Sequence, residues 1–338
     1  MTAPWDPPPV RRWPQVAGIV VLGLLAVIVP LRSTSIFTTD LTQLTALVLA
    51  FAGLNLLTHH LGLLSLGQGA FVGLGSACAL HAVNDFGLPP MLMPLVGLVF
   101  GFAVGAIIAV PALRLPKAYL ALLTLSLAVA FPIVLRQIDG PLPVTLDGEF
   151  IAPSWTGIAP KDEHLWEYGI VLAWTLVTLF VLHRTLAGPL GRAFVASRDN
   201  PQAAAAFGIP VYRLRLLGVA TSGALAGLAG GLLVIPVNFT DGPLYQSENS
   251  IKMFALAMAF GGQRLLYALP ASVMFVLLPV WIDDRNGWRT ATGLDGIVKS
   301  EAFIYAVLLL LTAYLTGGRG FAQVFERRRR RQPAGGVI

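Results

Sequence analysis

Long apolar stretches alternate with short polar segments along almost the whole chain. A helix needs about 20 mostly apolar residues to cross the hydrocarbon core of a bilayer, which is roughly 30 Å thick. The pattern therefore predicts an all-α polytopic membrane protein with about ten transmembrane helices. Their expected ranges are 16–31, 41–58, 63–83, 91–113, 118–135, 168–186, 213–235, 251–263, 265–282 and 302–317.

The composition agrees with a membrane protein. Of the 338 residues, 56% are hydrophobic and 12% are charged, whereas roughly 25% are charged in a typical soluble domain. The mean hydropathy is +0.74. Cys78 is the single cysteine, so no disulfide can form within the chain. Its place in an apolar run indicates a packing residue.

The distribution of charge predicts the orientation. With the N-terminus in the cytoplasm, the inner segments and adjoining span ends hold 16 of the 23 Lys and Arg residues but only 3 of the 17 Asp and Glu. This bias satisfies the positive-inside rule and places both termini in the cytoplasm. We expect a disordered leader (1–15), a permease domain (16–317) with an acidic external loop (136–167), and a basic tail (318–338). The tail suits anionic lipid, and we expect no nucleic-acid partner.

The apolar cores lack chemistry that other membrane proteins need. None carries Asp, Glu, Lys or Arg in its middle, which disfavours an ion-coupled secondary carrier or a channel with charged rings. The sequence shows no catalytic cluster and no metal-ligand spacing. It also has no G-x-x-x-x-G-K-[ST] motif. We therefore expect no enzyme, no bound cofactor and no metal, and any ATP would be used by another chain.

Glycine is unusually dense in the third span, Leu61–Ala77. Glycine is a poor helix former, so pairs this close can unwind a helix inside the membrane and expose backbone groups to a polar ligand. Two later groups, Gly97/Gly101/Gly105 and Gly223/Gly227/Gly231, have the spacing of closely packed helices. The candidate substrate-pathway residues are Asn55, Ser65, Gly67, Gln68, Gly69 and Thr124.

Residues 187–215 form a basic segment with start and stop signals for a short helix. Asp199 or Asn200 can cap the helix, and Pro201 suits its first position. Gly208 can take the left-handed conformation at the end, where Pro210 prevents continuation. Two turns are marginal alone, so we interpret the helix as a cytoplasmic docking element. The alternative is an ordinary loop that packs on its own domain.

Three stretches together resemble one family. They are GLNLLTHHLGLLSLGQGAFVGLGSA (53–77), RLPKAYLALLTL (114–125) and GRAFVASRDNPQAAAAFGIPVYRLRLLGVATSGALAGLAGGL (191–232). The chain is identified by these stretches as resembling the branched-chain amino acid ABC transporter permeases, and the LivM-like subunit is the most similar type. The resemblance covers most of residues 41–316, and the third stretch is its most specific part.

The resemblance implies a permease with an inverted repeat in a bacterial inner-membrane importer of branched-chain or related amino acids. Its implied partners are a second, usually different permease, two ATPases that use ATP, and an extracytoplasmic binding protein. ATP-driven closure of the ATPases would rock the permease halves around a midplane pathway. The residues that match the ATPase-coupling segment are Gly191, Arg192, Arg198, Asn200, Pro201, Ala204, Phe207 and Gly208.

Two departures from the family pattern leave the substrate open. The loop IDGPLPVTLDG (138–148) stands where a Thr-Gly-Gly element is common, and GGQRLLYALPASV (261–273) lacks a Gly-Ser pair. Polar side chains in the spans are sparse, which suits a cargo with an apolar side chain. An importer of urea, short amides or monosaccharides is the alternative within the superfamily. A stand-alone secondary carrier is a second alternative.

Overall fold

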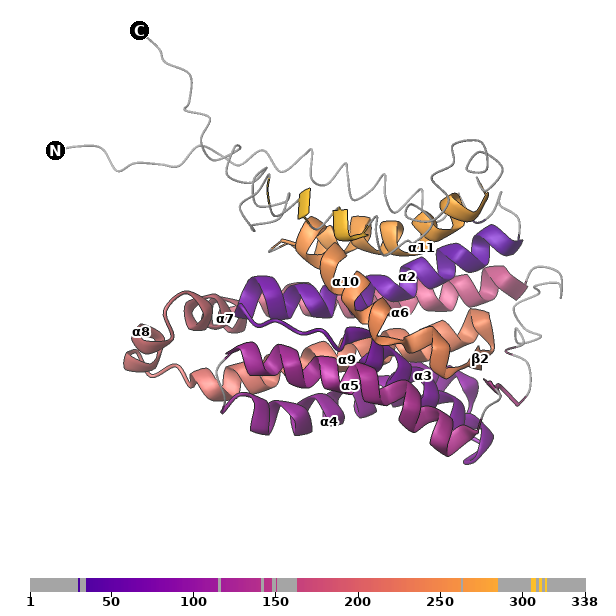
Figure 1. Ribbon diagram of the computed structural model, residues 1–338, viewed down its shortest axis with the longest axis horizontal. Coiled ribbons are helices and arrows are strands. Elements are labelled where there is room, and N and C mark those ends of the chain that lie inside the picture. Colours follow the sequence, from indigo (N-terminus) through magenta and orange to yellow (C-terminus); the bar gives the residue numbers. More distant parts are fainter. Residues whose placement is uncertain are drawn as a thin grey trace, which may run out of the picture.

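The computed structural model describes residues 35–114, 117–140, 143–147, 163–262 and 264–284, with the isolated positions 30, 150, 305–307, 310–311 and 314. The chain forms an elongated bundle of helices (Figure 1). Helices α7 and α8 lie at one end of the bundle, and strand β2 lies at the other. The main helices are α2 (Ser35–Asn55), α3 (Gln68–Asn84), α4 (Met93–Ala112), α5 (Lys117–Asp139), α6 (Glu163–Ala187), α9 (Val211–Val237), α10 (Ser247–Phe260) and α11 (Ala268–Asp284).

Helix α9 is the centre of the bundle and packs against α2, α3 and α4. The glycine spacing explains how α4 comes so close. A Cβ atom at Gly97 would collide with the carbonyl oxygen of Gly227, and one at Gly101 would collide with that of Gly223. Because glycine has no side chain, the two backbones pack in direct contact. The predicted role of these glycines in close packing is confirmed.

The core lies between α2, α3 and α9, where Phe51, Leu80, Leu228 and Leu232 are fully buried. The ring of Phe51 also meets Phe275 of α11 edge to face, with 5.9 Å between the ring centroids. Such aromatic pairs add about 0.5–1.5 kcal/mol beyond the area that they bury. This ring contact therefore holds α11 against the central helices.

The outer helices α4, α5 and α6 expose long rows of apolar side chains. Phe100 and Ile107 on α4, Leu122 and Ile133 on α5, and Phe180 on α6 are all exposed. Exposed apolar surface on this scale would be unfavourable in water and suits a lipid or protein neighbour. The fold therefore supports a multi-pass membrane protein with an all-α architecture.

Five helical stretches among the described residues are long and apolar enough to cross a membrane. They are Ile36–Leu61, Pro90–Ala112, Tyr119–Asp139, Glu163–Ala187 and Val211–Val237. Three further predicted spans form the shorter helices α3, α10 and α11. The predicted first span and most of the last span (302–317) lie outside the described residues. The total of ten spans and the inverted repeat therefore stay predictions.

The chain is not continuously helical between α2 and α3. This break lies before the segment in which glycine is densest, where it was predicted. α2 continues into a π-helical turn, η1 (Leu56–Leu61), and Gly62 then takes a left-handed conformation with φ of 64°. Residues 62–67 are not helical, and α3 runs unbroken through Gly69, Gly73 and Gly75. The predicted unwinding therefore occurs before Gln68, and the later glycines serve helix packing. Leu61 and Gly62 mark the point where the chain leaves the first helix.

The predicted external loop is shorter than the expected range of 136–167, because α5 ends at Asp139 and α6 begins at Glu163. Part of the loop also forms a strand that the sequence did not predict. β1 (Val144–Thr145) pairs antiparallel with β2 (Phe239–Thr240), which follows α9. This pairing ties the loop to the central helix at the end opposite α7 and α8.

Candidate functional site

The segment 187–215 contains two helices, α7 (Pro189–Asp199) and α8 (Pro201–Ala206). Helix α7 was not predicted from the sequence. Its signals were present, because Pro189 suits a first helical position. The buried residues Gly191, Phe194 and Ser197 recur every three positions. Gly191 lies against the carbonyl oxygen of Leu186, where no larger residue would fit.

The predicted short helix is confirmed as α8. Of the two candidate caps, Asn200 takes the role, since its side-chain oxygen accepts a hydrogen bond from the amide of Ala203 at 3.0 Å. Pro201 is the first helical residue. Gly208 has a φ of 79°, which favours glycine, and so lets the chain turn away. The local signals of the sequence therefore produced the local structure.

The two faces of α8 differ. Ala204 is 4% exposed and packs on the protein's own bundle, whereas Phe207 is 87% exposed immediately after the helix. Gln202, Ala205 and Ala206 are also exposed. The expected docking surface is therefore the outer face of α8 with Phe207, which we call the α8 surface. Arg192 is exposed on α7 as well.

Arg198 points into the bundle. Its guanidinium donates a hydrogen bond to the carbonyl oxygen of His59 in η1, and its Nε donates to Asp199 at 2.9 Å. A Cβ atom at Gly62 would lie 2.7 Å from Arg198 Cγ, so the arginine stem packs directly on the start of the unwound segment. Arg198 therefore connects α7 to the helix interruption.

A second contact holds α7 to the central helix. Arg215 of α9 donates to the carbonyl oxygen of Ser197 at 3.2 Å. Ser197 is itself buried, and Phe194 packs with the apolar cluster that includes Leu57 and Leu61 of η1. α7 is thus attached to both η1 and α9, and it would move with them.

Four of the predicted pathway residues lie at one buried junction near the start of α3, where Gln68 and Thr124 make hydrogen bonds and Gly67 and Gly69 lie beside them. Gln68 donates to the carbonyl oxygen of Ala50 at 2.8 Å, and Ser222 donates to Gln68 Oε1 at 3.5 Å. The amide of Leu66 donates to Thr124 Oγ1 at 3.0 Å. This junction joins α2, α3, α5 and α9. Its polar groups satisfy one another, so they stabilise the bundle.

The glycines on either side of Gln68 allow this junction to close. Gly67 lies against the backbone of Thr124, and the amide of Gly69 donates to Ser250 Oγ of α10 at 3.1 Å. Two other predicted residues, Asn55 and Ser65, make no side-chain hydrogen bond in this junction. Their buried side-chain atoms have no hydrogen-bond partner within the described part of the chain.

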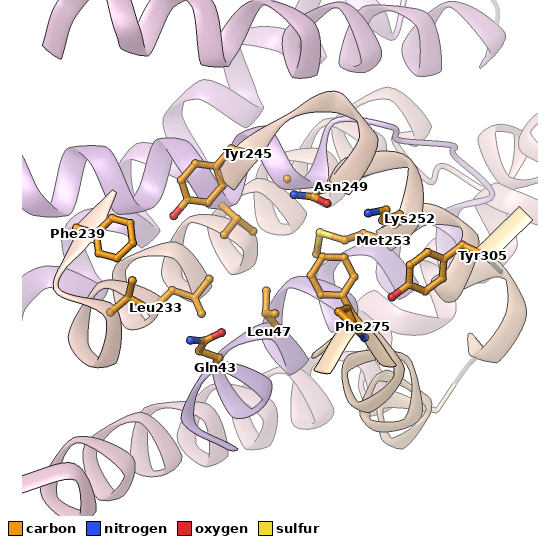
Figure 2. Close-up of a pocket in the computed structure, with 14 residues that line it drawn as sticks. Gln43, Leu47, Leu233, Phe239, Tyr245, Asn249, Lys252, Met253, Phe275 and Tyr305 are labelled. Carbon is orange, nitrogen blue, oxygen red and sulfur yellow. The ribbon is translucent and has the colours of Figure 1, made fainter. Parts of the chain in front are cut away.

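A cavity of about 470 Å³ opens between α2, α3, α9, α10 and α11 (Figure 2). Of the predicted pathway residues, only Gly69 lines it. Its polar lining residues are Gln43, Tyr245, Asn249, Lys252 and Tyr305, and its apolar ones are Leu47, Val72, Leu233, Val237, Phe239, Met253, Phe275 and Pro279.

Lys252 is the charged residue of this lining. Its Nζ lies 2.9 Å from Glu248 Oε1 and 5.8 Å from the centroid of the Tyr305 ring. Lys252 is not among the residues predicted from the sequence, although an ionisable residue just inside an apolar run is a usable signal. Within the described ranges, no group of three His, Cys, Asp or Glu side chains is placed to hold a metal ion.

Comparison with known proteins identifies the relatives. Residues 36–312 match the family described as branched-chain amino acid transport system permease component. The chain is 28% identical to the high-affinity branched-chain amino acid transport system permease protein LivM of Escherichia coli, over 79% of this chain and 68% of that protein. It is 29% identical to the LivM of Salmonella typhimurium, of which the match covers 60%.

Of two further relatives, one is also named for branched-chain amino acids and the other for a different cargo. The chain is 32% identical to the probable branched-chain amino acid transport permease protein LivH of Methanocaldococcus jannaschii, over 80% of this chain and 88% of that protein. It is 25% identical to the autoinducer 2 import system permease protein LsrC of an Enterobacter species, over 93% and 96%. No solved structure matches the chain.

Proposed function

The chain belongs to the family of permease components of branched-chain amino acid transport systems, and from that premise we propose that it is the membrane-spanning subunit of an ATP-driven importer. It has no ATPase motif of its own. Separate ATPase subunits bind ATP and dock on segment 187–215. The chain resides in the bacterial inner membrane with both termini in the cytoplasm, as its charge distribution favours.

The observation that carries this proposal is the arrangement of α7 and α8. The exposed Phe207 after α8 offers an apolar anchor to a partner, while Arg198 of α7 holds the π-helical turn η1. π-helical turns occur frequently at functional sites. A displacement of the α8 surface by a partner is therefore transmitted to the non-helical segment between α2 and α3.

We further propose branched-chain or related amino acids as the cargo. The family description and the LivM and LivH relatives favour them. The cavity supports the same class, since most of its lining is apolar. The LsrC relatives keep an autoinducer 2-like or monosaccharide cargo as the second candidate. A second permease subunit and an extracytoplasmic binding protein complete the proposed transporter.

Co-purification from native membranes in mild detergent tests the proposal, with the partners identified by mass. We expect the wild-type chain to retain an ATPase and a second permease. Phe207→Ser should lose most of the ATPase, because truncating an aromatic anchor typically costs about 2 kcal/mol or more. Phe86→Ser is the matched control, since Phe86 is 79% exposed and follows α3, far from α8 along the chain.

Two outcomes would contradict the proposal in different ways. Equal recovery of the ATPase with Phe207→Ser and with wild type would show that the α8 surface is not the docking site. Recovery of the wild-type chain alone, together with transport that needs no ATP, would favour a stand-alone carrier.

A further inference from the structure

The cavity in Figure 2 contains a cation in an unusual setting. The Lys252 side chain is 12% exposed, and the partner carboxylate of Glu248 is 56% exposed. Taking an ammonium group out of water costs several kcal/mol unless it is well paired. Glu248 pairs with this ammonium group, and the Tyr305 ring lies beside it. Because Lys252 also lines the cavity, an anionic group of a ligand that enters the cavity would be attracted to it.

The position of Lys252 also runs against the charge bias of the chain. Under the expected orientation it lies on the outer side, where acidic residues predominate. A lysine in this place does not help to set the topology. An ionisable side chain in an apolar segment is by default a candidate for a functional role.

The cavity is lined by both polar and apolar groups. Asn249 and Lys252 lie three residues apart on α10, so they share one face of that helix. In Figure 2 they stand away from Leu233 and Phe239, which line the other side of the opening. A volume of about 470 Å³ falls within the usual range of small-molecule sites, roughly 300–1,000 Å³.

We propose that this cavity is a binding site for a free aliphatic α-amino acid, and that Lys252 binds its carboxylate. The apolar side chain of the ligand packs against the lining of α9 and α11. Its ammonium group meets the side-chain oxygen of Asn249, which lies next to Lys252 in Figure 2. This inference rests on the proposed import of amino acids and assigns the site within the permease.

The site is also joined to the helix interruption. Gly69 lines the cavity, and its amide donates to Ser250 Oγ on α10, between Asn249 and Lys252 in the chain. Gln68, the first residue of α3, is held in the buried junction next to it. Filling the cavity therefore acts on the start of α3, which follows the unwound segment that Arg198 contacts at Gly62.

The test uses the complex purified from native membranes and placed in lipid nanodiscs. Binding of radiolabelled leucine is measured without the extracytoplasmic binding protein, and leucinamide, which lacks the carboxylate, serves as the matched ligand. We expect wild type to bind leucine about tenfold more tightly than leucinamide, because a charge-assisted hydrogen bond is lost with the amide. This arm needs no variant and so does not depend on how a variant folds.

Substitutions of Lys252 test whether the preference for leucine over leucinamide depends on this lysine. Lys252→Met should weaken leucine binding about tenfold and leave leucinamide binding unchanged, whereas Lys252→Arg should retain most of the preference for leucine. Equal weakening of both ligands by Lys252→Met would show a purely structural role and overturn the proposal. Equal binding of leucine and leucinamide by wild type, or binding of a monosaccharide in place of leucine, would also overturn it.

Failure of this site is distinguishable from failure of the proposed function. ATP-driven uptake is measured with the same preparation in the presence of the binding protein. Amino-acid uptake that is unchanged by Lys252→Met, together with unchanged leucine binding, would reject the site and leave the importer intact. A wild-type complex that hydrolyses ATP but moves no amino acid would reject the proposed function.

Discussion

The contact between Arg198 and η1 makes a sharp prediction about coupling. Arg198→Ala removes the hydrogen bond from the guanidinium to the carbonyl oxygen of His59 and the packing of the stem on Gly62. It leaves Phe207 and the rest of the α8 surface in place. We therefore expect this variant to keep its ATPase and to lose transport per ATP hydrolysed.

The magnitude follows from the contacts. A hydrogen bond to a charged group contributes about 1.5–3 kcal/mol. The ion pair with Asp199 adds little, because Asp199 is largely exposed and such pairs contribute about 0–1 kcal/mol. A loss of about 2–3 kcal/mol shifts the equilibrium between attached and detached α7 by roughly 30- to 150-fold. A shift of this size weakens the attachment of α7 to η1, where the packing of Phe194 remains.

The assay is ATP-driven uptake in proteoliposomes, with ATP hydrolysis and ATPase recovery measured on the same sample. Arg184→Ala is the control, because Arg184 is an exposed arginine at the end of α6 and lies outside segment 187–215. We expect Arg198→Ala to lower the ratio of uptake to hydrolysis at least tenfold and Arg184→Ala to change it little. Arg198→Lys should give an intermediate ratio, since one ammonium group cannot reproduce the guanidinium geometry.

Two results would refute this reasoning. If Arg198→Ala releases the ATPase as fully as Phe207→Ser, then Arg198 contacts the ATPase and the link to η1 is incidental. If its uptake ratio equals that of wild type, then the signal from α7 travels by another route, such as the contact of Arg215 with Ser197.

Two further predictions concern the bundle itself. Gly97→Leu should prevent the contact of α4 with α9 and sharply lower the yield of folded protein in detergent. Gly169→Ala is the control, since Gly169 has open space around it and the change should raise Tm slightly through helix propensity. Equal yields and equal Tm values for the two variants would contradict the packing. Gln68→Leu should destabilise the protein by about 1–3 kcal/mol, because the carbonyl of Ala50 loses its donor; an unchanged Tm with impaired uptake would instead place Gln68 in the substrate path.

Features that depend on neighbours in the chain were predictable. The short helix α8 follows from Asn200, Pro201 and Gly208, since capping, a preset φ and a positive φ act within a few residues. The long apolar runs likewise predict helices, because an unpaired backbone is too costly in a bilayer. The family resemblance was readable in the same way.

Other features depend on which helices meet. The glycine spacing predicted close packing, but the sequence did not say that Gly97 would face Gly227. The sequence likewise did not show which polar residues line the cavity. The side chain of Gln68 forms hydrogen bonds with α2 and α9, whereas Lys252, which was not predicted, lines the cavity. A polar residue in an apolar run has the same pattern whether a neighbour pairs with it or not.

Segment 187–215 shows most clearly which features can be read from the sequence and which depend on the packed structure. Its sequence contained the signals for a helix at Pro201, an arginine at 198 and an aromatic residue at 207. The packed structure assigned Arg198 to the interior and Phe207 to the surface, because η1 and Gly62 leave room for one long stem at that point. Local backbone chemistry acts over a few residues and can be read from the chain, whereas the direction of a side chain depends on contacts between residues more than a hundred positions apart.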